Sequence, residues 1–160
     1  MSDLHHHTPA DARPLEVRVA TITMVAETIR AVDFVSVDGQ PLPGFTAGAH
    51  INLKLPGDLS RSYSLTNGPE TRDRYSIAVN RDVASRGGSA YVVDRLKVGD
   101  VLTIDPPHNT FGLVEDAEQS AFFAGGIGIT PILSMIRHLE ALKRPWKLFY
   151  AARNRASAAF

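Results

Sequence analysis

Short runs of alternating apolar and polar residues, each closed by a turn signal, do most to narrow the fold of this chain. Residues 15–25 alternate with a period of two, which is typical of a half-buried β-strand. Further short strands are predicted at 34–37, 51–55, 62–65, 75–79 and 101–104. Dipeptides such as Asp38-Gly39 and Gly99-Asp100 separate these strands. The spacing predicts an all-β barrel or sandwich, interrupted by one helix that Ser89 would cap.

The pattern changes near residue 112. Residues 115–119 are polar and predict a linker. The apolar runs 121–124 and 146–151 predict strands buried on both faces, as in a parallel sheet. Between them, Thr130 is the predicted N-cap of a helix and Pro131 its first residue. The order strand, helix, strand predicts one βαβ unit, the opening of a parallel sheet.

Composition excludes several classes of function. The 17 basic residues balance 17 acidic ones, which argues against a nucleic-acid partner held by a broad basic surface. The chain has no cysteine, so disulfides, zinc–thiolate sites and cysteine-ligated iron–sulfur clusters are excluded within it. No apolar run approaches the roughly 20 residues of a membrane span, and residues 1–10 lack a signal-peptide layout. These features predict a soluble, cytoplasmic protein without a membrane partner. Three histidines in the polar leader fit a solvated tail or a tag remnant better than a metal site: His5, His6 and His7.

The segment Arg61-Ser62-Tyr63-Ser64 is the first candidate binding motif. Alternation along a strand puts Arg61, Tyr63 and Leu65 on one face and the two serines on the other. An arginine can bind a phosphate, a tyrosine can pack on a planar ring, and serine hydroxyls can bond ring heteroatoms. Taken alone, the segment fits an ordinary barrel strand with a surface arginine slightly better.

Two glycine motifs follow. Gly87-Gly88-Ser89 opens the predicted helix, where unpaired N–H groups suit an anion, although a plain glycine turn is commoner. Gly126-x-Gly128-x-x-Pro131 lies between a predicted strand and a helix, with proline where the dinucleotide fingerprint has its third glycine. A tight turn would also explain this loop, but the strand–loop–helix–strand context favours a nucleotide site.

In this order and spacing the motifs make the chain resemble the ferredoxin–NADP reductase superfamily, and within it the phthalate dioxygenase reductase and vanillate demethylase reductase group. The matching stretches are 61–67, 75–79, 87–94, 98–100, 109–111 and 125–135. The resemblance implies a polar leader at 1–13, a Greek-key antiparallel flavin-binding β-barrel at 14–112, and at 113–160 the first βαβ unit of a Rossmann-like nicotinamide domain, truncated there. It implies a flavin-dependent NAD(P)H oxidoreductase, the reductase component of a multicomponent oxygenase with an oxygenase or ferredoxin partner.

The resemblance also implies roles for particular residues. Those expected to contact the flavin are Arg61, Tyr63, Ser64, Leu65, Ile77, Ala78, Val79, Gly87, Gly88 and Ser89. Gly126 and Gly128 are expected to face the nicotinamide nucleotide, and Pro131 is expected to be cofactor-binding. Thr130 and Ser64 are the expected catalytic residues, near the reactive part of the flavin ring.

The flavin is expected to be FMN, with FAD as the alternative. The Gly-Gly-Ser segment suits the doubly charged terminal phosphate of FMN. FAD would need a platform for its adenine, and Tyr91 is the only aromatic candidate near the short helix.

Three departures from the family pattern matter. The chain contains no [2Fe–2S] domain, its nicotinamide site is weak or incomplete, and His108 stands where the family commonly has arginine. Two other interpretations therefore stay open. One is a non-catalytic flavin-binding or electron-relay fragment, and the other is a degenerate product without activity.

Overall fold

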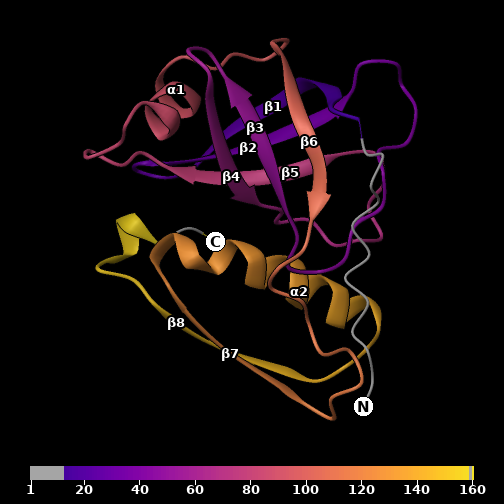
Figure 1. The fold of residues 1–160 in the computed structure, drawn as a ribbon. Coiled ribbons are helices and arrows are strands. Elements are labelled where there is room, and N and C mark those ends of the chain that lie inside the picture. Colours follow the sequence, from indigo (N-terminus) through magenta and orange to yellow (C-terminus); the bar gives the residue numbers. More distant parts are fainter. Residues whose placement is uncertain (1–12, 159) are drawn as a thin grey trace.

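The computed structural model describes residues 13–158 and 160, and its first six strands form one antiparallel sheet (Figure 1). The strands are β1 (Leu15–Ala26), β2 (Ile29–Ser36), β3 (His50–Leu55), β4 (Leu59–Ser64), β5 (Tyr75–Asn80) and β6 (Val101–His108). Their order in the sheet is β4-β3-β6-β1-β2-β5. A bridge between Leu65 and Ile77 joins the two outer strands, so the sheet closes into a barrel. This confirms the predicted Greek-key barrel; His5, His6 and His7 lie outside the described residues.

The barrel core follows from the alternation along its strands. Val17 and Val19 of β1 and Ile51 and Leu53 of β3 are all at most 1% exposed, while their sequence neighbours point away from the core. Helix α1 (Gly88–Asp94) closes one side with Val92. The core is therefore filled by side chains and leaves ligand sites to the rim.

Buried Tyr75 ties the loop after β2 to the barrel. Its hydroxyl donates a hydrogen bond to the carbonyl of Pro43 at 2.6 Å, and its ring meets Phe45 edge to face. Burial raises the pKa of Tyr75, so the phenol stays protonated and keeps donating.

The C-terminal unit is the predicted βαβ unit. Strands β7 (Ser120–Gly125) and β8 (Trp146–Ala151) are parallel, and the chain between them forms the one-turn 3-10 helix η1 (Gly126–Gly128) and helix α2 (Ile129–Ala141). A last 3-10 turn, η2, spans Arg155–Ser157. Helix α2 lies between the barrel and the two-stranded sheet (Figure 1). Its Ile132 and Ile136 pack toward the sheet together with Trp146.

Both helices begin two residues earlier than predicted. Helix α1 begins at Gly88 behind Gly87, whose φ of 101° is left-handed, so Ser89 is not the cap and its Oγ instead accepts from the N–H of Asp82 at 3.2 Å. Helix α2 begins at Ile129 because η1 has already turned the chain. Pro131 is therefore the third helical residue, still in the first turn, where its missing N–H costs nothing.

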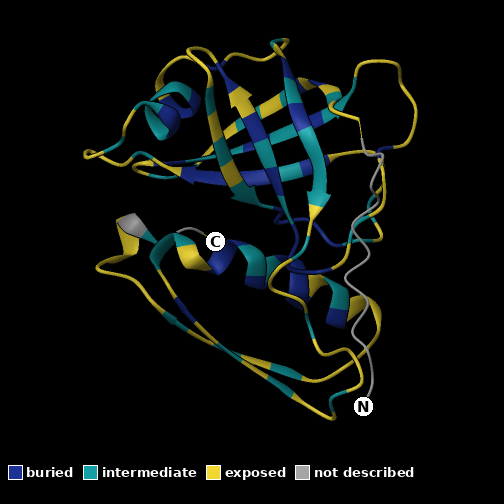
Figure 2. Ribbon diagram, in the orientation of Figure 1, coloured by how far each residue is buried: buried dark blue, intermediate teal, exposed yellow. Residues whose placement is uncertain are grey.

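The prediction that β7 and β8 are buried on both faces is also wrong. Burial alternates along both strands, and Phe123 and Phe149 are 75% and 53% exposed (Figure 2). Their rings stack on each other with centroids 4.8 Å apart. The reason is that α2 covers one face of this sheet, while no described helix packs on the other. Among the residues that the structure describes, no helix is both long enough and apolar enough to cross a membrane.

Candidate functional site

Strand β4 carries the first motif at one end of the barrel sheet. It pairs with β3 so that Arg61 lies opposite Leu53 and Tyr63 opposite Ile51. Tyr63 is partly buried against the barrel core, and Leu65 just beyond the strand is fully buried. Burial raises the pKa of Tyr63, more than the charge of Arg61 lowers it, so its phenol is neutral near pH 7.

The side chain of Arg61 lies across the start of α1. A Cβ atom built on Gly88 would stand 2.6 Å from Cγ and 3.0 Å from Nε of Arg61. The guanidinium donates to the carbonyl of Ser60 at 2.8 Å. The absence of a side chain at Gly88 therefore lets a cationic group reach the first turn of a helix, where N–H groups lack intrahelical partners. A guanidinium beside such N–H groups can bind an anion.

Strand β5 brings the predicted residues Ile77, Ala78 and Val79 to the same side of the barrel. Ile77 and Val79 point into the core and are at most 2% exposed, so only their main chain could meet a ligand. Ala78 points the other way and packs in one cluster with Ile29 and with Ile127 of η1. The predicted nucleotide loop at Gly126 and Gly128 therefore lies against the predicted flavin strand.

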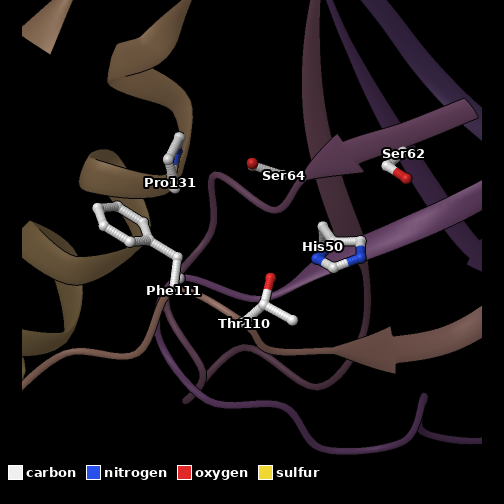
Figure 3. A pocket seen from close by; sticks show the side chains of 7 residues that line it. His50, Ser62, Ser64, Thr110, Phe111 and Pro131 are labelled. Atoms are coloured by element: carbon white, nitrogen blue, oxygen red, sulfur yellow. The ribbon is translucent and has the colours of Figure 1, made fainter.

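A pocket of about 290 Å³ opens where the barrel meets the first turn of α2 (Figure 3). Its lining comes from the loop before β3, from β3 and β4, from the loop after β6 and from the start of α2: Gly48, His50, Ser62, Ser64, Thr110, Phe111 and Pro131. The structure thus brings the predicted residues Ser64 and Pro131 to one pocket. Neighbouring Thr130 is 7% exposed, and its hydroxyl donates to the carbonyl of Ile127 at 3.0 Å. The hydrogen of this hydroxyl is therefore already used in a hydrogen bond within the loop that leads into α2.

His50 is a pocket residue that the sequence reasoning missed. It lies directly opposite Ser64 across the β3–β4 pair, and its ring meets His108 edge to face with centroids 5.7 Å apart. Burial, and second the charge of His108, lower the pKa of His50. The imidazole is therefore neutral near pH 7 and can both donate and accept a hydrogen bond in the pocket. Only the strand register could have revealed it.

Gly48 is the point where three segments meet. Its φ is +95°, and a Cβ atom on it would stand 1.9 Å from the carbonyl oxygen of Phe111 and 2.7 Å from Cε of Met135. The loop before β3, the loop after β6 and helix α2 can approach this closely only because residue 48 has no side chain. This contact forms one wall of the pocket.

Polar contacts hold the second half of α2 against the barrel and against the segment that leads from the barrel to β7. Arg137 donates from Nη1 to the carbonyl of Thr66. His138 contacts Glu70 through Nδ1 and Glu115 through Nε2, the latter at 3.1 Å. These partners were missed as well, because His138 is 68 residues from Glu70 along the chain and no motif links them.

No family model matches the chain, but known proteins do. Tetrachlorobenzoquinone reductase of Sphingobium chlorophenolicum is 50% identical over 91% of this chain and 45% of its own length. Vanillate O-demethylase oxidoreductase of a Pseudomonas species is 47% identical over 91% of this chain and 46% of its own length. The solved structure of phthalate dioxygenase reductase, described as modular for electron transfer from pyridine nucleotides to [2Fe–2S], superposes with a TM-score of 0.89 at 39% identity, over 92% of this chain and 46% of that one.

The chain spans about half the length of the curated relatives that it matches. Over that half, sequence and structure agree with the resemblance stated above. The superposition on phthalate dioxygenase reductase covers 92% of this chain, so it includes both the antiparallel barrel and the parallel βαβ unit. The predicted resemblance to the group of phthalate dioxygenase reductase and vanillate demethylase reductase is therefore confirmed over the matched half.

Proposed function

We propose that this chain binds a flavin where the barrel meets α2 and serves as the flavin module of an NAD(P)H-dependent oxygenase reductase. The observation that carries the proposal is the contact between Arg61 and Gly88. Arg61 lies two residues before half-buried Tyr63 on β4, the strand that also brings Ser64 to the pocket. The proposed barrel domain spans 14–112 and the proposed nicotinamide unit 113–160. The names of the relatives, reductases and an oxidoreductase, support the same class of activity.

The proposed flavin phosphate binds at the start of α1. Arg61 would pair with it, and the N–H groups of Gly88 and Ser89 would donate to it. The close approach of Arg61 to Gly88, which a Cβ would block, supports this fit. Tyr63 would flank the ring system, while buried Leu65 would offer only its main chain. The main chain of Ile77, Ala78 and Val79 would run beside the ribityl chain.

The proposed reaction is electron transfer from NAD(P)H to an iron–sulfur or oxygenase partner. The bound flavin would supply the chemistry, accepting a hydride from the nicotinamide and releasing electrons one at a time. Ser64 would donate its hydroxyl hydrogen to a ring heteroatom from inside the pocket, and Pro131 would close the pocket opposite it. Gly126 and Gly128 would let the nicotinamide nucleotide approach the backbone. Thr130 would keep this loop in place through its bond to Ile127.

Mixing the purified chain with flavin and then with NADH, while recording the visible spectrum, tests this function. We expect a bound-flavin spectrum and slow bleaching by NADH. Slow reduction is expected because dinucleotides bind at a switch point between two halves of a sheet, and the described nicotinamide unit has two parallel strands. A flavin spectrum that NADH leaves unchanged would favour the electron-relay alternative. Absence of any bound flavin would refute the proposal.

The identity of the flavin is a separate prediction, and we expect FMN. A terminal phosphate monoester carries about two negative charges near neutral pH, which suits Arg61 and the start of α1. Tyr91, the candidate adenine platform, instead packs partly buried against the barrel core. The measurement is denaturation of the flavin-loaded protein followed by mass spectrometry of what is released. FAD alone in the released fraction would contradict this assignment.

A further inference from the structure

His138 joins three segments that are far apart in the sequence. It lies on α2 between Glu70, in the loop that follows β4, and Glu115, in the loop that precedes β7. The histidine side chain is 14% exposed, whereas the two glutamates are 45% and 54% exposed. One imidazole therefore ties the helix to the barrel through Glu70 and to the segment before β7 through Glu115. The three residues Glu70, His138 and Glu115 are called the clasp below.

The geometry of the clasp requires a particular protonation state. Both ring nitrogens face carboxylate oxygens, which only accept hydrogen bonds when ionised. A neutral imidazole has one N–H donor, so one of its nitrogens would present a lone pair to a carboxylate. An imidazolium has two donors and satisfies both contacts. The neighbouring cation, Arg137, is directed to the carbonyl of Thr66 and leaves the two carboxylates to His138.

Helix α2 connects the clasp to the proposed flavin pocket. Helix α2 is a single run of 13 residues that carries Pro131 in its first turn and His138 two turns later. The barrel supplies Ser64 and His50 to the same pocket. Any change in how the second half of α2 lies against the barrel is therefore carried to the gap between Pro131 and Ser64.

We propose that His138 is a positioning residue: its imidazolium clasps α2 to the barrel and sets Pro131 against Ser64, and the clasp loosens when the ring loses its proton. Its meaning for catalysis rests on the proposed function, but the clasp itself does not.

The direction of the pH effect follows from the surroundings of the ring. Burial alone would lower the pKa of His138, but the hydrogen bonds and charges of Glu70 and Glu115 outweigh it and raise the pKa above the ordinary 6.5. A group whose pKa is raised by docking contributes fully below its ordinary pKa. The contribution is lost as the pH rises through the raised pKa. Docking of α2 should therefore weaken on the alkaline side of about pH 6.5.

The test measures docking without any flavin. The chain has no cysteine, so Lys97→Cys on the barrel and Lys147→Cys on β8, both exposed, can carry a pair of fluorescent dyes. Single-molecule energy transfer then counts docked and undocked molecules at about pH 6 and about pH 8.5, on either side of the histidine range. We expect the undocked fraction of the parent chain to rise between the two. In His138→Gln we expect the undocked fraction at the lower pH to be roughly two- to fivefold that of the parent, because a partly exposed ion pair contributes a free energy of that size. We also expect the undocked fraction of this variant to change little with pH.

Two further variants sharpen the result. Glu115→Gln removes one carboxylate from an exposed loop and should reduce the pH response without abolishing folding. His108→Gln removes a histidine outside the clasp and should keep the full response of the parent. The proposal is overturned if His138→Gln responds to pH as the parent does, or if the parent shows no response. Because no flavin is added, a failure of flavin binding would leave this result readable.

Discussion

Replacing Gly48 by alanine is expected to lower the free energy of unfolding by about 3 kcal/mol or more. The added methyl group would stand 1.9 Å from the carbonyl oxygen of Phe111, a backbone atom that cannot turn aside. It would also meet Met135 and adopt a φ of +95°, which residues with a Cβ rarely do. Denaturant unfolding of the purified variant, followed by circular dichroism, measures the loss.

A matched control separates the steric clash from the backbone strain. Gly57, in the β3–β4 turn, has a similar φ of +78°, but a Cβ atom on it would meet nothing within 4 Å. Gly57→Ala should therefore cost about 1–2 kcal/mol, the price of the left-handed backbone alone. Equal losses in the two variants would mean that the three segments do not meet tightly at Gly48.

Replacing Arg61 by alanine is expected to raise the dissociation constant for flavin by roughly 10- to 100-fold. Removing one charge-assisted hydrogen-bonding group from a bound phosphate costs about 1.5–3 kcal/mol, and each 1.4 kcal/mol is about tenfold in affinity. Arg61 is partly buried across the start of α1, where solvent screens it less than an exposed arginine. Titration of the protein into flavin, followed by quenching of flavin fluorescence, gives the two constants.

Two variants test whether the effect belongs to this site. Arg74→Ala removes the same charge from an exposed loop and should leave flavin affinity within about twofold, as expected for a screened surface charge. Arg61→Lys keeps the charge but loses the two-pronged donor geometry, so its affinity should fall between parent and alanine variant. Parent-like affinity in Arg61→Ala would show that the phosphate binds elsewhere.

The strands could be predicted because each carries its own signal. Alternation marks the inward residues of β1, β3 and β5, and the turn dipeptide Pro56-Gly57 closes β3. Strand pairing carries no such local signal. The contact between His50 and Ser64 depends on the register of β3 on β4, so His50 could not be assigned to the pocket beforehand.

The errors at the helix starts have a common cause. Ser89 and Thr130 have the side chains that usually cap helices, but backbone conformation decided the start in both cases. At Gly87 the left-handed φ turns the chain before the serine is reached. At Gly126 the 3-10 turn does the same one turn before the threonine.

The contacts between α2 and the barrel could not be predicted at all. Their members come from loops with no regular pattern, as Glu70 and Glu115 illustrate. Only the folded chain brings them to one histidine. The glycine motifs proposed for phosphate and nucleotide, 87–89 and 126–131, are by contrast each continuous in the sequence, so they could be proposed from the sequence alone.

The two hydrophobic cores differ greatly in size, and this inequality has a practical consequence. Buried residues from β1, β2, β3, β5 and β6 fill the barrel, whereas Ala124, Ile129, Ile132 and Ile136 form the described core beneath β7 and β8. The smaller core should open at a lower free energy, as a separate cooperative unit. Trp146, the single tryptophan of the chain, packs against that smaller core. The fluorescence of Trp146 should therefore report the opening of the C-terminal unit and not the unfolding of the barrel.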